Sequence, residues 1–225
     1  MPQAESITDW ISAVSAAVAA FGVVILAAQI HFAKRQIELS RRQMVDDHDR
    51  SRRKCAIDLM VEWSTFVREQ GTAAKAIAET LDAERANLLW ATKAFRLPER
   101  YKRFVEHYLE RRGTPCVLAV EGDQVQIETE HCHELRRGMV AYLNLLESIL
   151  AARRHNVADR DMLKEQFKDL IVPEKNKTIM SELRRAAGGP STFPSIEAFV
   201  VEITREKMTP APGKGVLGDE PLGPV

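Results

Sequence analysis

Four neighbouring residues form the densest group of potential metal ligands in this chain, His131-Cys132-His133-Glu134. On a helix, residues two positions apart point in different directions and cannot share one metal ion, whereas on a strand His131 and His133 would lie on the same face. The sequence holds no second pair of ligands at zinc-site spacing. We therefore predict a polar helix start at this position, with neither a metal nor a cofactor.

Other arrangements typical of enzymes give no stronger signal. Gly213-Lys214-Gly215 lacks the surrounding frame of a Walker A phosphate loop, and no Ser-His-Asp or Cys-His pairing follows from chain order. Three cysteines, Cys55, Cys116 and Cys132, are an odd and sparse set that indicates reduced thiols in the cytoplasm. Because 32 basic residues balance 32 acidic ones, no overall field attracts nucleic acid, which is not an expected partner.

The element that must position everything else is an uncharged stretch of twenty residues, 11–30, with the sequence ISAVSAAVAAFGVVILAAQI. At about 1.5 Å of rise per residue, such a helix covers roughly 30 Å, the thickness of the bilayer hydrocarbon core. We predict a transmembrane helix whose anchoring residues are Trp10, Ile11, Phe21, Ile25 and Ile30. Two alternatives are a buried core helix, because the stretch is alanine-rich, and a cleaved signal peptide, which an acidic start and a run of twenty do not suit.

The charged residues on either side of this stretch predict its orientation. Residues 1–10 contain Glu5 and Asp9 and no basic residue, whereas the 31–54 stalk is basic, and basic flanks stay in the cytoplasm. We therefore expect a single-pass protein of the inner membrane with its N-terminus outside. The basic residues of the stalk exceed its acidic ones by four; they are Lys34, Arg35, Arg41, Arg42, Arg50, Arg52, Arg53 and Lys54. This surplus of positive charge favours binding to an anionic lipid surface or to a phosphate-bearing partner. The alternative is a solvated helix face whose charges only set the topology.

The stalk should continue the membrane helix, because no glycine or proline occurs between Ile30 and Gly71. An apolar seam at alternating spacings of three and four favours a short coiled coil; its residues are Ile30, Ala33, Ile37, Ser40 and Met44. Self-association is indicated by the small residues Ser12, Ala16 and Ala20, whose spacing of four allows close helix packing in lipid.

A cytoplasmic helical domain is predicted over residues 55–207. Its first helical stripe comprises Cys55, Leu59, Trp63 and Phe66, and a second helix follows Gly71. Pro98 opens a third helix that ends at Gly113, and residues 115–130 form either a small β-hairpin or an ordered loop.

The helical pattern resumes through Leu135, Met139, Tyr142, Leu146 and Ile149. Near that face, Asn144 and Glu147 form either a buried polar pair or part of an exposed edge. Asp159 is a predicted N-cap of a helix that ends at Pro173, a short helix covers 175–187, and Ser195 caps a last helix. The Pro- and Gly-rich tail, 208–225, is predicted to be disordered.

Three segments carry a resemblance: IDLMVEW (57–63), LNLLESI (143–149) and VADRDMLKEQFKDLI (157–171). With the preceding span and basic helix, they resemble a bacterial domain-of-unknown-function family of short, N-terminally anchored helical proteins, some of them associated with phage defence. The layout is also similar to the membrane accessory protein of type VI-B CRISPR systems. That resemblance implies a relic of the HEPN ribonuclease motif, an Arg and a His with four to six residues between them. Arg100 with His107, and Arg41 or Arg42 with His48, fit this spacing.

The expected fold is thus mainly α: one N-terminal transmembrane helix continuing into a cytoplasmic helical bundle with a small β-hairpin. The expected function is that of a membrane-anchored interaction protein, an oligomeric effector or partner tether in phage defence. Its expected partners are the lipid bilayer, further copies of itself and a cytoplasmic protein. The alternative is a membrane-anchored HEPN-like ribonuclease that uses Arg100 and His107.

Overall fold

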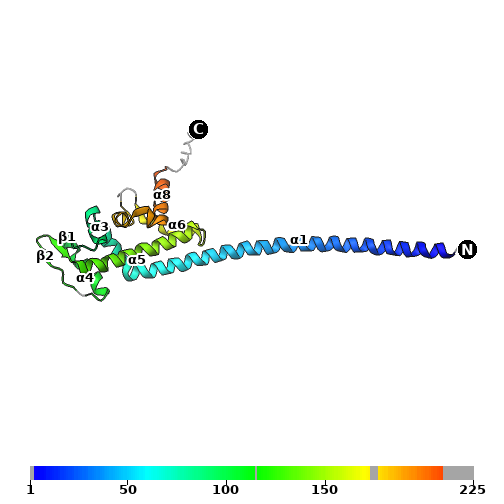
Figure 1. Cartoon of the computed structure of the whole chain (residues 1–225), viewed down its shortest axis with the longest axis horizontal. Helices are drawn as coiled ribbons and strands as arrows, with labels where there is room; N and C mark the ends of the chain where they lie inside the picture. Colours follow the sequence, from blue (N-terminus) through cyan, green and yellow to red (C-terminus); the bar gives the residue numbers. More distant parts are fainter. Residues whose placement is uncertain (1–2, 115, 173–176, 210–225) are drawn as a thin grey trace, which may run out of the picture. The chain divides into compact units, whose positions relative to one another are not determined.

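The computed structural model of the chain describes residues 3–114, 116–172 and 177–209, and its fold is mainly α-helical, as predicted. The chain divides into two units, residues 1–51 and 52–225. The longest element is α1, Gln3–Phe66, one continuous helix of 64 residues (Figure 1). This confirms that the apolar stretch and the basic stalk belong to one helix, as the absence of a helix breaker after Ile30 predicts.

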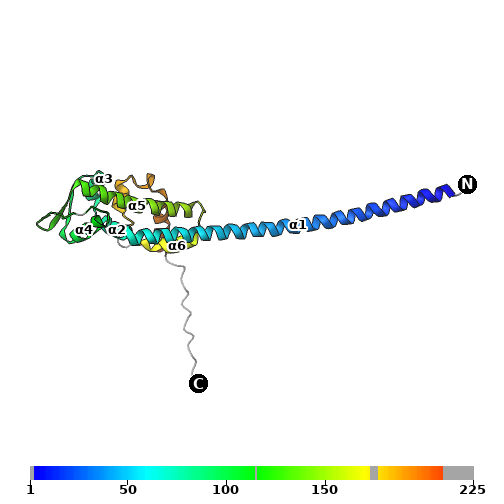
Figure 2. The same cartoon turned by 90° about the horizontal axis from the view of Figure 1, so that it is seen from below.

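The second unit is built around α5, Thr129–Arg154, which carries more buried residues than any other helix or strand in the described part of the chain (Figure 2). The last turns of α1 pack into this core through Trp63. The centroid of its ring lies 4.9 Å from that of Tyr142 and 5.2 Å from that of Phe167, and both contacts are edge to face. Cys55, Leu59 and Phe66 pack half-buried against the same core. The predicted apolar stripe is therefore confirmed.

Between α1 and α4 the chain is more divided than the sequence predicts. A five-residue π-helical turn, Val67–Gly71, is followed by α2, Thr72–Ala78, and α3, Ala83–Trp90. The prediction of one helix after Gly71 was wrong, because the Asp82 side chain accepts the Arg85 N–H at 2.8 Å and so begins a new helix. Pro98 ends a strand, β1, Phe95–Pro98, and a 3₁₀ turn, Glu99–Tyr101, precedes α4, Lys102–Arg111.

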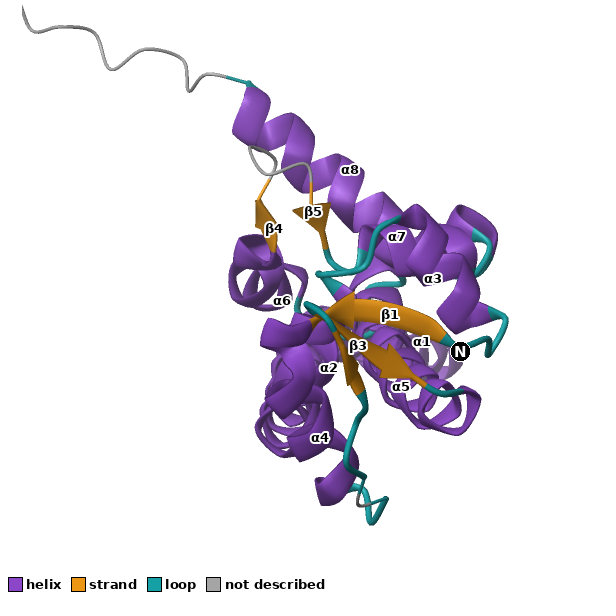
Figure 3. Ribbon diagram, turned by 90° about the vertical axis from the view of Figure 1, so that its left-hand side faces the viewer, coloured by secondary structure: helices purple, strands orange, loops and turns teal. Residues whose placement is uncertain are grey.

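The predicted hairpin is present and gains a third strand. Strands β2, Val120–Glu121, and β3, Gln124–Ile127, are antiparallel, and β1 pairs with the other edge of β3 in the order β1-β3-β2 (Figure 3). Gly122 in the tight turn has φ +65°, a conformation that glycine adopts without strain. Phe95, Leu97, Val125 and Ile127 are buried, so one face of the sheet joins the core.

The C-terminal part contains α6, Arg160–Phe167, a 3₁₀ turn, Lys168–Leu170, strands β4, Ile171–Val172, and β5, Lys177–Thr178, then α7, Ser181–Ala186. A second 3₁₀ turn, Gly189–Ser191, leads to α8, Pro194–Met208. Asp159 caps α6 as predicted. The predicted helix over 175–187 was too long, because β5 pairs with β4 first. The predicted helix stop at Pro173 and residues 210–225 of the predicted tail lie outside the described residues.

Helix α8 is attached to α5 by charged groups. The Glu147 carboxylate accepts the backbone N–H groups of Ser195 and Ile196 at 2.8 and 2.9 Å, so it satisfies two free donors at the start of α8. The prediction of Ser195 as a side-chain cap was therefore wrong. Arg153 donates to both carboxylate oxygens of Glu202 at 2.8 and 2.6 Å.

Candidate binding groove and membrane segment

A small groove of about 120 Å³ lies in the second unit, where the π-helical turn and α2 meet α4. A π-helical turn widens the helix locally, and such turns are rare and frequently lie at functional sites. The groove is lined by Val67, Arg68, Glu69, Thr72 and Ala73 from the first segment and by Phe104, His107, Tyr108, Arg111 and Arg112 from the second. Side chains from two helices far apart in sequence therefore form one concave surface.

The floor of the groove is apolar. Val67 and Ala73 are half-buried, and Phe104 remains 41% exposed. Tyr108 is buried where α4 crosses α5: a Cβ added to Gly138 would lie only 1.5 Å from the Tyr108 hydroxyl oxygen. Burial raises the pKa of Tyr108, and the adjacent Arg112 opposes this only in part. The phenol is therefore neutral at physiological pH and cannot add negative charge to the groove.

The rim of the groove carries an excess of basic groups. Arg68, His107 and Arg111 are exposed and form no ion pair with any described residue. Arg112 is half-buried and lies 3.4 Å from the Glu134 carboxylate. Glu69 is the acidic residue among those lining the groove. The free arginines outnumber this carboxylate, so the groove favours an anionic group beside an apolar one.

The two residues of the proposed ribonuclease pair lie in different surroundings. His107 lies on α4 and lines the groove. Arg100 belongs to the preceding 3₁₀ turn, where its guanidinium stacks over the Tyr101 ring at 4.9 Å, and it is not among the groove residues. Among the basic residues that line the groove, Arg111 is the nearest to His107 in sequence, one helical turn further along α4.

The group of potential ligands at 131–134 lies in the first turns of α5. His131 and Cys132 are buried and His133 is exposed, so the helix directs their side chains apart. The Cys132 thiol donates to the Lys93 carbonyl at 3.2 Å, and burial raises its pKa to about 12. Among the residues that the structure describes, no three His, Cys, Asp or Glu side chains are grouped so as to hold a metal ion.

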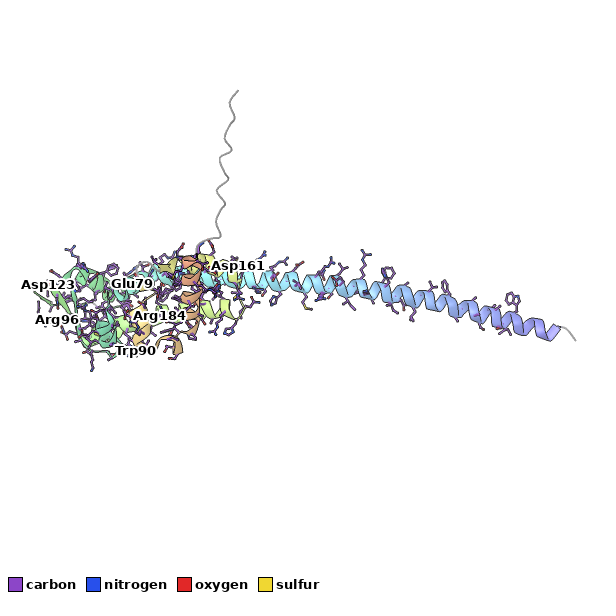
Figure 4. All side chains as sticks on the ribbon, turned by 90° about the horizontal axis from the view of Figure 1, so that it is seen from above. Glu79, Trp90, Arg96, Asp123, Asp161 and Arg184 are labelled. Atoms are coloured by element: carbon purple, nitrogen blue, oxygen red, sulfur yellow. The ribbon has the colours of Figure 1, made fainter. Side chains whose placement is uncertain are left out.

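In the first unit, α1 contains one stretch that is long and apolar enough to cross a membrane. The large apolar anchoring residues are well exposed along it; they are Trp10, Ile11, Phe21, Ile25 and Ile30. Side chains project on all sides of the helix (Figure 4). The eight basic residues predicted for the stalk follow on the same helix, and Arg42 and Arg50 pair with Glu38 and Asp47 one turn away.

Two charged clusters escaped prediction and serve the fold. Arg184, 2% exposed and labelled in Figure 4, binds the Glu197 carboxylate and donates to the carbonyl oxygens of Thr178 and Ile179. These bonds hold Ile179 and Met180, whose φ angles of 34° and 51° lie in the left-handed region that non-glycine residues disfavour. The second cluster is Arg153 with Glu202. Neither cluster lies in the groove.

Comparison with protein families gives one match, to a domain of unknown function, DUF4760, over residues 11–202. The chain belongs to the DUF4760 family. The match includes both the apolar part of α1 and the helical domain, so the predicted resemblance to a family of unknown function holds at that level. Nothing in the comparisons links the chain to CRISPR accessory proteins. Neither the curated proteins nor the solved structures gave a match.

Proposed function

We propose that this DUF4760 protein is a membrane-anchored tether: α1 inserts in the inner membrane, and the cytoplasmic domain binds an acidic segment of a protein partner in the groove. The observation that carries the proposal is the combination, in one chain, of an uncharged twenty-residue stretch of α1 whose described side chains are exposed and a groove in which Arg68 and Arg111 form no ion pair with any described residue.

The anchor is supported by the solvation of apolar side chains. Trp10, Phe21 and Ile30 are 74%, 69% and 63% exposed, respectively. Each fully exposed side chain of this size forgoes about 1.5–3 kcal/mol of burial energy, so a run of them is stable only against lipid or another protein. The helix satisfies its own backbone hydrogen bonds, as a span must.

The size of the groove limits what it can hold. At about 120 Å³ it is smaller than the roughly 300–1,000 Å³ typical of pockets for small molecules. It can take one apolar side chain against Phe104 and Ala73, with carboxylates of the same segment beside Arg68 and Arg111. We therefore favour an acidic peptide with a single apolar anchor residue over a nucleotide or another small ligand.

The anchor is tested by protease treatment of inner-membrane vesicles. The protein should stay in the membrane after a carbonate wash. Protease should remove the helical domain from inverted vesicles and leave it intact in spheroplasts. Release by carbonate would contradict the span, and digestion in spheroplasts would contradict the orientation.

The groove is tested with two labelled nine-residue peptides. One has a central Phe among Asp and Glu, and the other has Lys in place of every acid. Fluorescence anisotropy of the detergent-solubilised full chain should show salt-sensitive binding of the acidic peptide alone. Arg68→Glu with Arg111→Glu should weaken it at least tenfold. The matched control is Arg103→Glu with Arg154→Glu, which changes the charge equally at exposed positions outside the groove and should change affinity less than twofold.

Equal losses in both double variants would show a diffuse charge effect and contradict a specific groove. The ribonuclease alternative makes a different prediction. His107→Ala would abolish the cellular effect of an enzyme, whereas a tether should lose only part of its affinity, because Arg68 and Arg111 remain. A role in phage defence rests on the resemblance alone. A plaque assay comparing cells with and without the wild-type protein tests it, and His107→Ala in the same assay tests the enzyme.

A further inference from the structure

The stalk part of α1 carries an exposed apolar seam with no partner among the described residues. Ile30, Ile37 and Met44 are 63%, 69% and 70% exposed, and Ala33 and Ser40 between them are exposed as well. In a heptad register, Ile30, Ile37 and Met44 occupy a positions, and Ala33 and Ser40 occupy d positions. No charged residue interrupts this series. We infer that residues 30–44 form a parallel two-stranded coiled coil with a second copy of this chain.

Other registers along the same helix place charges in the seam. Phe32 and Leu39 are also exposed apolar residues one heptad apart, but Arg35, Arg42 and Asp46 share their face. Val45 lies on a face with Glu38, Arg41 and His48. Only the register through Ile30 and Ile37 gives five consecutive seam positions of apolar or small residues, so it is the one that a partner helix can cover.

The flanking positions fit a second copy in parallel. In a parallel pair, each g residue faces the e residue of the next heptad of the partner. Here Gln36 and Gln43 occupy g, and Arg41 and His48 occupy e. An amide can accept a hydrogen bond from each of these basic groups, so no like charges face one another. The salt bridge between Arg42 and Glu38 at 3.2 Å lies at f and b, on the outer side.

The same register runs back into the apolar stretch. Its a and d positions there include Ser12, Ala16, Ala19 and Leu26, and small residues let two helices approach closely in lipid. Two heptads span only about 21 Å and would be marginal alone in water. Insertion in one membrane fixes the parallel direction and confines the copies, so this part of the inference rests on the proposed anchor.

Disulfide cross-linking in native membranes tests the pairing. The background is Cys55→Ala with Cys116→Ala; buried Cys132, with its high thiol pKa, stays in place. Single cysteines at Ile37 or Met44 should form dimers with a mild oxidant. The matched positions Arg35 and Arg42, on the outer side, should give at least fivefold less dimer.

Charge changes at g give a second readout that does not depend on the seam residues. Gln36→Glu should face Arg41 of the other copy and raise the dimer yield of the Met44→Cys chain, whereas Gln36→Lys should lower it severalfold. Glu38→Lys, on the outer side, should leave the yield unchanged. These variants lie at exposed helix positions, so the fold is not at risk.

Equal cross-linking at seam and outer positions, or no response to the Gln36 variants, would overturn the pairing. A carbonate wash of the same membranes separates this failure from that of the anchor. Protein that stays in the membrane without seam-specific dimers contradicts the pairing alone, and protein released by the wash contradicts the anchor.

Discussion

The contact between Gly138 of α5 and Tyr108 of α4 gives the sharpest prediction, because it positions the floor of the groove. In an open helix interior, Gly→Ala stabilises a protein by about 0.5–1 kcal/mol. Here the added Cβ would lie 1.5 Å from the Tyr108 hydroxyl oxygen and 2.8 Å from its Cζ. The substitution should therefore destabilise the domain in spite of helix propensity.

The size of the effect follows from the distances. Ordinary van der Waals contact begins at 3.4 Å, so the hydroxyl must retreat from 1.5 Å to that distance. Tyr108 is only 3% exposed, so either its ring or α4 must shift to make room. Forced overpacking of this kind costs about 1–3 kcal/mol. Allowing for the helix-propensity gain, we expect a net loss of about 1–2 kcal/mol, or roughly 2–8 °C in Tm for a domain of this size.

Thermal unfolding of the detergent-solubilised full chain, followed through the tryptophan fluorescence to which buried Trp63 contributes, measures this loss. Asn144→Ala is the matched control, because Asn144 is exposed on the same helix and its replacement should raise Tm slightly. Adding Tyr108→Phe to Gly138→Ala removes the hydroxyl but leaves Cζ, so it should recover part of the loss. If Gly138→Ala raised Tm as Asn144→Ala does, the close contact would be refuted.

Three further predictions concern charged groups of the helical domain. Glu147→Ala removes the acceptor of two N–H groups at the start of α8 and should lower the free energy of unfolding by about 1–3 kcal/mol in denaturant, more than Glu147→Gln, which keeps one acceptor. Arg184→Met should lower the free energy of unfolding by about 2–4 kcal/mol in the same assay, because Glu197 loses its ion-pair partner and the carbonyl groups bound by Arg184 lose their donor. The hydrogen bond from Arg153 holds the pKa of Glu202 below its ordinary value of 4.5, so its stabilisation is complete above pH 4.5 and is lost as pH falls through the lowered pKa. The Tm difference between wild type and Glu202→Gln should therefore shrink below pH 4.5, and a constant difference from pH 7 to 3 would contradict this assignment.

Sequence reasoning worked where the signal was local. The continuity of α1 follows from an uninterrupted run without helix breakers, and the hairpin from a Gly-containing turn between alternating residues. The Asp159 cap is also a local pattern, an acceptor two and three residues before the N–H groups that it binds. In each of these cases, a few neighbouring residues contain both partners of the interaction.

The parts that escaped prediction depend on residues far apart in the chain. Glu147 caps a helix that begins 47 residues later, so no local pattern could distinguish this role from an exposed edge. Strand β1 is four residues long and exists because β3, nearly thirty residues downstream, offers it an edge. The groove joins a π-helical turn to α4, and its arginines stand out only once the ion pairs of the other charged residues are known. Composition alone, with its zero net charge, conceals that local excess.

The two proposals concern different units and reinforce one another energetically. A groove that holds a single side chain and a few carboxylates offers little buried surface, and an isolated interaction of this size is weak. Pairing through the α1 seam would bring two grooves to one place at the membrane. Once one acidic segment of a partner has bound one groove, a second acidic segment of the same partner would meet the other groove at an effective concentration in the millimolar range. This holds if the linker between the two segments spans the distance between the grooves. Under this scheme a small groove is sufficient, because the anchor and the seam supply the local concentration that the groove itself cannot.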